Sequence, residues 1–141
     1  MSPAAITIHS RRFGSLEVAP EEIIHFPEGL VGLPGHDYVV VVHDPESPFC
    51  WLQSAEDPDL ALPVTDPWRF FPSYVVDVPA AEPASDVRVW VTVRASSKLE
   101  EFSANLRAPL LVHESTGHQV INEAPEAPVR APLFGSQALA A

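Results

Sequence analysis

Apolar and polar residues alternate most clearly at residues 87–94, where every second residue is a valine. This period of two is typical of an antiparallel β-strand with one buried face. Trp90 then lies on the opposite face, between Arg88 and Thr92, and we expect it to support the core. Other runs rich in β-favouring residues are 6–10, 13–18, 23–26, 38–43, 49–53, 61–65, 73–78, 110–113 and 119–121. Short, irregularly spaced strands predict a mainly β protein with one compact β-barrel-like domain.

Sixteen prolines divide the chain into short pieces, because proline lacks the backbone N–H and restricts the residue before it. Long helices are therefore not expected, and at most one short helix is predicted, at residues 96–102. The small and polar residues 79–86 predict a loop between two strands. We place the β-barrel-like domain at residues 1–121. Large apolar residues become rare beyond it, so residues 122–141 are predicted to be an Ala/Pro-rich C-terminal tail, partly disordered.

The cellular compartment follows from three observations. No apolar run approaches the roughly 20 residues that a membrane-spanning helix needs. The N-terminal residues have no positively charged leader ahead of an apolar core, as a secretory signal would. A single cysteine, Cys50, sits between apolar residues and suits a reducing compartment. We therefore expect a cytoplasmic protein, with no membrane partner, that exists as a monomer.

Charge is the strongest compositional feature, with 19 acidic and 8 basic side chains and a net charge of −11. Eleven of the acidic residues lie between Phe13 and Trp68, a stretch without any Lys or Arg. Such a balance argues against direct nucleic-acid binding, which requires a basic surface. The acidity is explained either by solubility alone or by a surface that attracts a basic partner.

Catalytic and metal-binding patterns are not found in the sequence. The six histidines are scattered without metal-ligand spacing, and neither a nucleophile elbow nor a phosphate-binding loop motif occurs. Cys50 with His43 as a base is a weak candidate pair, because the cysteine is flanked by aromatic residues. Acid–base chemistry by Asp57, Asp66 or His43 has no supporting spacing. We predict a protein that is not an enzyme and has no cofactor or metal.

Six segments in a fixed order resemble the bacterial flagellar assembly factor FliW family. They are residues 26–34, 48–54, 57–67, 91–93, 104–112 and 117–121. The resemblance implies a β-barrel-like domain without a catalytic site, which binds the translational regulator CsrA and relieves its repression of flagellin mRNA. It also implies binding of flagellin, which competes with CsrA and so couples flagellin level to its translation. The turn at Thr116 to His118 lacks the basic character usual in the family, which leaves a dedicated flagellin chaperone without a regulatory role as an alternative.

Partner-binding residues are predicted from charge and aromatic content. CsrA binds RNA and must carry basic surface, so acidic side chains are its expected contacts. Flagellin is expected to dock an amphipathic helix through apolar contacts. The candidates, all between residues 46 and 71, are Glu46, Phe49, Trp51, Gln53, Glu56, Asp57, Asp59, Asp66, Trp68 and Phe71.

Overall fold

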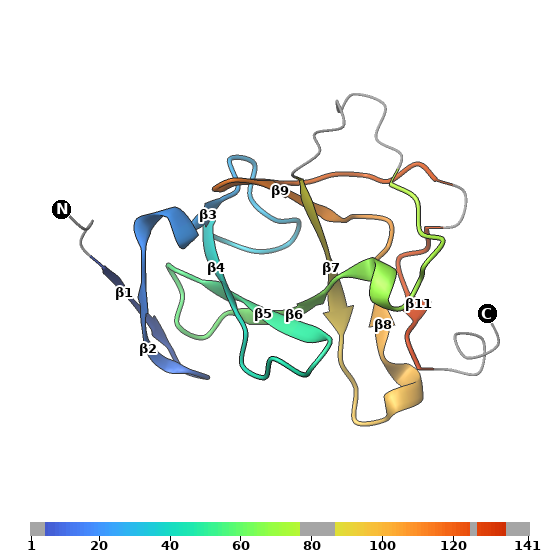
Figure 1. Ribbon diagram of the computed structural model, residues 1–141, viewed down its shortest axis with the longest axis horizontal. Coiled ribbons are helices and arrows are strands. Elements are labelled where there is room, and N and C mark those ends of the chain that lie inside the picture. Colours follow the sequence, from blue (N-terminus) through green and yellow to red (C-terminus); the bar gives the residue numbers. More distant parts are fainter. Residues whose placement is uncertain (1–4, 77–86, 125–126, 135–141) are drawn as a thin grey trace.

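Seven strands close into a β-barrel in the computed structural model, which describes residues 5–76, 87–124 and 127–134 (Figure 1). They are β3 (Ile24–His25), β4 (Asp37–Val41), β5 (Phe49–Ser54), β6 (Ala61–Thr65), β7 (Arg88–Arg94), β9 (Leu110–His113) and β10 (Thr116–Gln119). The order around the barrel is β7-β6-β5-β4-β3-β10-β9, and β9 returns to β7 through pairs such as Trp90 with Leu110. Only β3 and β10 pair in parallel. The predicted mainly β, barrel-like fold is confirmed.

Two further pairs of strands extend the barrel. An N-terminal hairpin, β1 (Ile6–Ser10) and β2 (Gly14–Val18), forms a separate two-stranded sheet. The short strands β8 (Ser103–Ala104) and β11 (Ala131–Pro132) continue from the C-terminal half of β7. The first half of β7 pairs with β9 and the second half with β8, so the sheet forks along this strand.

Three single-turn 3-10 helices, η1 (Pro20–Glu22), η2 (Pro67–Arg69) and η3 (Leu99–Glu101), are the helical segments of the described residues. The short helix predicted at residues 96–102 is thus reduced to η3. Proline begins η1 and η2, and the Asp66 carboxylate caps η2 by accepting the Trp68 backbone N–H at 3.0 Å. A single helical turn is too short to show a helical repeat of apolar residues, so the sequence pattern does not predict such turns.

One predicted strand, at residues 73–78, is not formed in its described part. The Trp68 indole donates to the Tyr74 carbonyl and the Asn122 amide to the Val75 carbonyl, so side chains occupy groups that a strand would use. Residues 77–78 and the loop predicted at 79–86 lie outside the described residues. The strand predicted at 119–121 forms earlier, as β10, and ends at Gln119.

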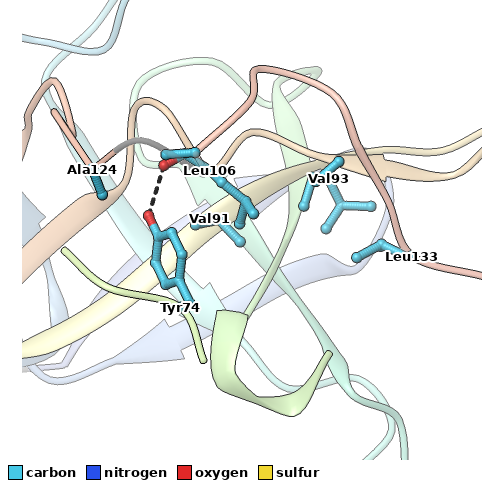
Figure 2. Packing of buried hydrophobic residues seen from close by; sticks show 9 residues of the cluster. Tyr74, Val91, Val93, Leu106, Ala124 and Leu133 are labelled. Carbon is cyan, nitrogen blue, oxygen red and sulfur yellow. Dashed lines mark hydrogen bonds between the residues drawn. The ribbon is translucent and has the colours of Figure 1, made fainter. Parts of the chain in front are cut away.

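Two hydrophobic clusters lie on opposite faces of β7. The barrel interior holds residues such as Phe26, Tyr38 and Leu52, with Trp90 packed against them, as predicted. Val91 and Val93 point the other way, into a second cluster with Tyr74, Leu106 and Leu133 (Figure 2). The Tyr74 hydroxyl donates to the Leu106 carbonyl at 2.7 Å and fixes this cluster to the segment after β8 (Figure 2).

The C-terminal segment is part of the second cluster. Ala124, Ala127, Ala131 and Leu133 are buried, and β11 pairs with β8. The domain boundary predicted after residue 121 is therefore too early, because the fold continues to at least residue 134. Alanine buries little apolar area per residue, so the sequence pattern understates packing that several small side chains make together. Residues 135–141 lie outside the described residues.

Candidate functional site

Eight of the ten candidate residues separate to the two ends of the barrel, and the other two, Trp51 and Gln53, lie along β5 between them. β4 begins at Asp37 and β5 returns antiparallel to it, so the β5–β6 turn at residues 55–60 lies at the end where β4 begins. This turn carries Glu56, Asp57 and Asp59. Glu46 lies in the β4–β5 loop at the opposite end, where Phe49 pairs with Thr65 and η2 follows. Asp66, Trp68 and Phe71 belong to that opposite end.

The end with the β5–β6 turn gathers carboxylates from the β3–β4 loop, the start of β4 and the β5–β6 turn. Glu56 accepts hydrogen bonds from the backbone N–H groups of His36 and Asp37, at 2.8 and 2.9 Å. Asp37 also contacts His25, at 2.6 Å between Oδ1 and Nδ1, and Glu28 contacts His118 at 2.8 Å. We call the five carboxylates at this end, Glu28, Asp37, Glu56, Asp57 and Asp59, the acidic end.

One carboxylate of the acidic end, Glu56, is held in an ionised state by backbone donors. The N–H groups of His36 and Asp37 hold the pKa of the Glu56 carboxyl below its ordinary value of 4.5. Hydrogen bonds to the charged form favour it, so this carboxylate remains negative at neutral pH. The loop geometry that presents the two N–H groups depends on Gly35, whose φ of +86° suits glycine. A fixed negative charge is what long-range attraction of a basic partner requires.

The β5–β6 turn is an Asx-type turn in which Glu56 and Asp59 are exposed and Asp57 is half-buried. Asp57 Oδ1 accepts the Asp59 backbone N–H at 2.9 Å. The exposed Asp59 carboxylate pairs with the exposed Arg11 guanidinium of the N-terminal hairpin. Arg11 also donates its backbone N–H to the Pro58 carbonyl at 2.9 Å. The hairpin therefore reaches the edge of the acidic end.

The turn of the N-terminal hairpin covers the outer face of β5. Gln53 is fully buried, and its amide oxygen accepts the Ser10 hydroxyl at 2.7 Å. Beside it, Trp51 lies under the Arg12 guanidinium, which is 4.1 Å from the ring centroid, and next to Phe13 at 5.9 Å between centroids. Gln53 is thus out of reach of a partner, and Trp51 is half-buried beneath the protein's own basic turn.

Aromatic residues at the opposite end pack mostly into the second cluster. Phe49 stacks on Phe70 at 5.7 Å and Phe71 packs partly buried against the same cluster. Trp68 is 40% exposed, and its indole N–H donates to the Tyr74 carbonyl at 2.9 Å, next to Val75, which is 60% exposed. Trp68 and Val75 therefore form an exposed apolar surface, with Phe71 partly buried nearby in sequence, and we call the three residues the apolar surface.

Within the part of the chain that the structure describes, no three His, Cys, Asp or Glu side chains are placed to hold a metal ion. Burial raises the pKa of the Cys50 thiol, which disfavours the reactive thiolate. No helix among the described residues has the length and hydropathy needed to cross a bilayer.

Comparison with known proteins identifies the family. The model of the FliW protein family matches residues 7–133 of the chain. The chain belongs to the FliW family. The flagellar assembly factor FliW of Desulfitobacterium hafniense strain Y51 is 38% identical over 137 residues, covering 90% of each chain. The flagellar assembly factor FliW of Alkaliphilus metalliredigens is 37% identical, covering 75% of this chain and 71% of that protein.

A solved FliW structure has the same fold. The crystal structure of a flagellar assembly factor FliW superimposes with a TM-score of 0.81 at 26% identity, covering 94% of this chain and 99% of that one. The match to the FliW family model extends to Leu133. It therefore includes the alanine-rich segment that packs on β7. Membership in the FliW family supports a role in flagellar assembly, and the relatives above are named as flagellar assembly factors.

Three features of this FliW-family surface were not found by sequence reasoning. Glu28 and Asp37 join the acidic end only through loop contacts with His118 and with Glu56. The basic pair Arg11 and Arg12 lies on the candidate surface although it precedes the acidic stretch in sequence. Only the folded chain reveals these contacts, because the residues that meet at the acidic end are 19 to 90 positions apart in sequence.

Proposed function

We propose that this chain is a cytoplasmic, monomeric flagellar assembly factor that binds CsrA and flagellin in alternation. Binding of CsrA relieves its repression of flagellin mRNA, and binding of flagellin releases CsrA. The chain then couples flagellin level to flagellin translation by binding alone, without catalysis. The observation that carries this proposal is the acidic end of a FliW-family barrel, where two loops and the start of β4 bring five carboxylates together.

The acidic end supports the CsrA part of the proposal by electrostatics. A regulator that binds RNA carries basic surface, and five carboxylates in adjoining loops present a complementary field. Glu56 is held ionised by two backbone N–H groups, and the Asp57 carboxylate is oriented by the Asp59 backbone N–H that it accepts. Contacts between exposed charges are screened by salt, so the affinity for CsrA should fall as ionic strength rises.

A matched pair of double variants tests the CsrA site. Asp57→Asn with Asp59→Asn removes two charges from the acidic end, and Asp44→Asn with Glu46→Gln removes two from the opposite end. Asparagine keeps the turn acceptor in both cases, since Asp57 Oδ1 accepts the Asp59 N–H and Asp44 Oδ1 accepts the Glu46 N–H. Calorimetry with CsrA should show at least a tenfold loss for the first pair and little change for the second. Equal losses would place the site elsewhere.

The apolar surface supports the flagellin part. An amphipathic helix docks through apolar anchors, and exposed Trp is a frequent binding hot spot. Trp68 is oriented by its bond to the Tyr74 carbonyl, so its exposed edge is pre-positioned rather than mobile. The acidic end and the apolar surface lie at opposite ends of the barrel, so alternation would require either a large partner that spans both or a change communicated through the barrel.

Two exposed valines give a matched test of the flagellin site. Val75→Gln removes apolar surface beside Trp68, whereas Val31→Gln changes a valine that is 80% exposed in the loop carrying Glu28. The affinity for flagellin should fall several-fold for Val75→Gln and remain unchanged for Val31→Gln.

The alternative of a dedicated flagellin chaperone is separated by the same titrations. If calorimetry at low salt detects no binding of CsrA, while flagellin binds with an affinity that depends on Val75, the chain acts as a chaperone without a regulatory role. His118 of the Thr116–His118 turn pairs with Glu28, so the His118→Arg variant would report on this turn. Gain of CsrA binding by that variant would favour the chaperone role for the native chain.

A further inference from the structure

A pocket of about 240 Å³ lies at the fork of the sheet, where the second half of β7 leaves β9 and pairs with β8. Its lining comes from β7, β8, the residue after β8 and the residues before β11. The lining residues are Thr92, Val93, Arg94, Ser103, Asn105, Val129 and Arg130. None of them belongs to the acidic end or to the apolar surface, so the proposed function does not use this pocket.

Strand register places the polar lining on one face of three adjacent strands. Arg94 of β7 is paired with Ser103 of β8, and Pro132 of β11 is paired with Ser103 on the other side. Beyond these pairs the Leu106 N–H donates to the Pro128 carbonyl, so the two segments stay adjacent, and Asn105 and Arg130 both line the pocket. Residues directly opposite each other in antiparallel strands have Cβ atoms about 4.5–5.5 Å apart. Two guanidinium groups thus flank a hydroxyl and an amide.

The opposite face of the same strands is a fixed support. Val93, Ala104 and Ala131 are mutually paired across β7, β8 and β11, and all three are buried in the second cluster. The pocket is therefore built on packed strands rather than on a loose loop, which favours a defined geometry for a bound group.

The available polar groups of the pocket are donors. Within the described residues, neither Arg94 nor Arg130 has an ion-pair partner, and the Ser103 hydroxyl makes no side-chain hydrogen bond. Asn105 uses its oxygen to accept the N–H groups of Arg107 and Ala108, which leaves its amide N–H₂ as a donor. Among the described residues, no acidic side chain lines the pocket. A set of free donors with two positive charges is complementary to an oxyanion.

We propose that this pocket binds the phosphate group of a small molecule, either inorganic phosphate or a phosphate monoester. A planar carboxylate matches one guanidinium fork, whereas a tetrahedral dianion accepts from donors on three strands at once. The chain carries a net charge of −11, which repels anions in general. Phosphate binding by such a protein therefore requires a local site, and this pocket supplies two arginines that pair with no carboxylate of the described residues.

Nuclear magnetic resonance titration of the full chain tests the proposal. Inorganic phosphate, added at constant ionic strength, should shift the amide signals of Thr92, Ser103 and Asn105 along saturating curves. Glycerol phosphate is the second probe: saturating shifts at the same signals place a monoester in the pocket, and their absence restricts it to the free ion. Sodium acetate is the third, and acetate affinity equal to that of phosphate would overturn the choice of a tetrahedral anion.

Matched arginine variants separate the pocket from general charge. Arg94→Gln and Arg130→Gln should each weaken phosphate binding at least tenfold, and Arg94→Lys should weaken it less. Arg88→Gln is the control, because Arg88 is exposed on the same strand with the same side-chain orientation but pairs with β9, outside the pocket. An equal loss in Arg88→Gln, or shifts that never saturate in the native chain, would overturn the proposal. Thermal unfolding of each variant verifies that it is folded.

Discussion

Replacing Gln53 by methionine asks whether this residue holds the fold or binds a partner. Gln53 is fully buried, accepts the Ser10 hydroxyl at 2.7 Å and donates to the Ser54 and Asp57 carbonyls at 3.0 and 3.2 Å. Methionine has a similar length and flexibility but makes none of these bonds. The variant therefore keeps the volume of the side chain and removes only its polar contacts.

The expected cost follows from the groups left without partners. The Asp57 carbonyl still accepts the Leu60 N–H, so the main losses are at the Ser10 hydroxyl and the Ser54 carbonyl. Leaving a buried polar group unsatisfied costs about 1–3 kcal/mol, so Gln53→Met should lower the free energy of unfolding by about 2–4 kcal/mol. Urea unfolding followed by tryptophan fluorescence measures this loss.

Hydrogen exchange locates the effect of the same change. The amide protons of β1 and β2 should exchange faster in Gln53→Met, because Ser10 anchors the hairpin to β5. Gln119→Met is the control, since Gln119 also uses both ends of its amide, to Val31 and Ala108, but away from the hairpin. Native urea stability and native hairpin exchange in Gln53→Met, together with lost partner binding, would show that Gln53 is a contact residue after all.

Three further changes test other parts of the fold. Gly117→Ala would place a Cβ 2.8 Å from Cζ of the fully buried Phe26, costing about 1–3 kcal/mol, and Phe26→Leu in the same chain should recover part of this loss in urea unfolding. Arg12→Ala removes the cation above Trp51 and should cost about 0.5–1 kcal/mol, while native stability in this variant would show that the contact contributes nothing. The lowered pKa of Glu56 means that its carboxylate stabilises the fold fully above pH 4.5 and that this contribution is lost as the pH falls through the folded pKa. The stability difference between the native chain and Glu56→Gln should therefore shrink in urea titrations from pH 7 to pH 3, and a constant difference would refute the assignment.

Local pattern predicted the strands well where one face is uniformly apolar. The alternating valines gave the direction of both Val91 and Trp90, and the runs at 6–10, 61–65 and 110–113 match β1, β6 and β9. The 73–78 run failed, because Trp68 and Asn122 bond its carbonyls from a distance. Such contacts join parts of the chain that a sequence window never contains together.

The candidate surface was less predictable than the fold. Glu46 and Glu56 are close in sequence, yet a strand runs between them and carries them to opposite ends of the barrel. Gln53 and Trp51 share the outer face of β5. The sequence pattern does not show that the N-terminal hairpin packs on this face. Exposure is set by which distant segment packs on a face, and a single sequence does not contain that information directly.

The two faces of β7 restrict how this strand can be aligned with its neighbours. When a strand with one solvated face slips by one residue, only the side chains of its single buried face are misplaced. In β7 such a slip would exchange Trp90 and Val91 between two cores of different shape. The indole would enter a space built for valine and alanine, while valine would leave a void in the barrel. β7 therefore has a single tolerated register, and misaligned pairing during folding is penalised on both sides of the sheet at once.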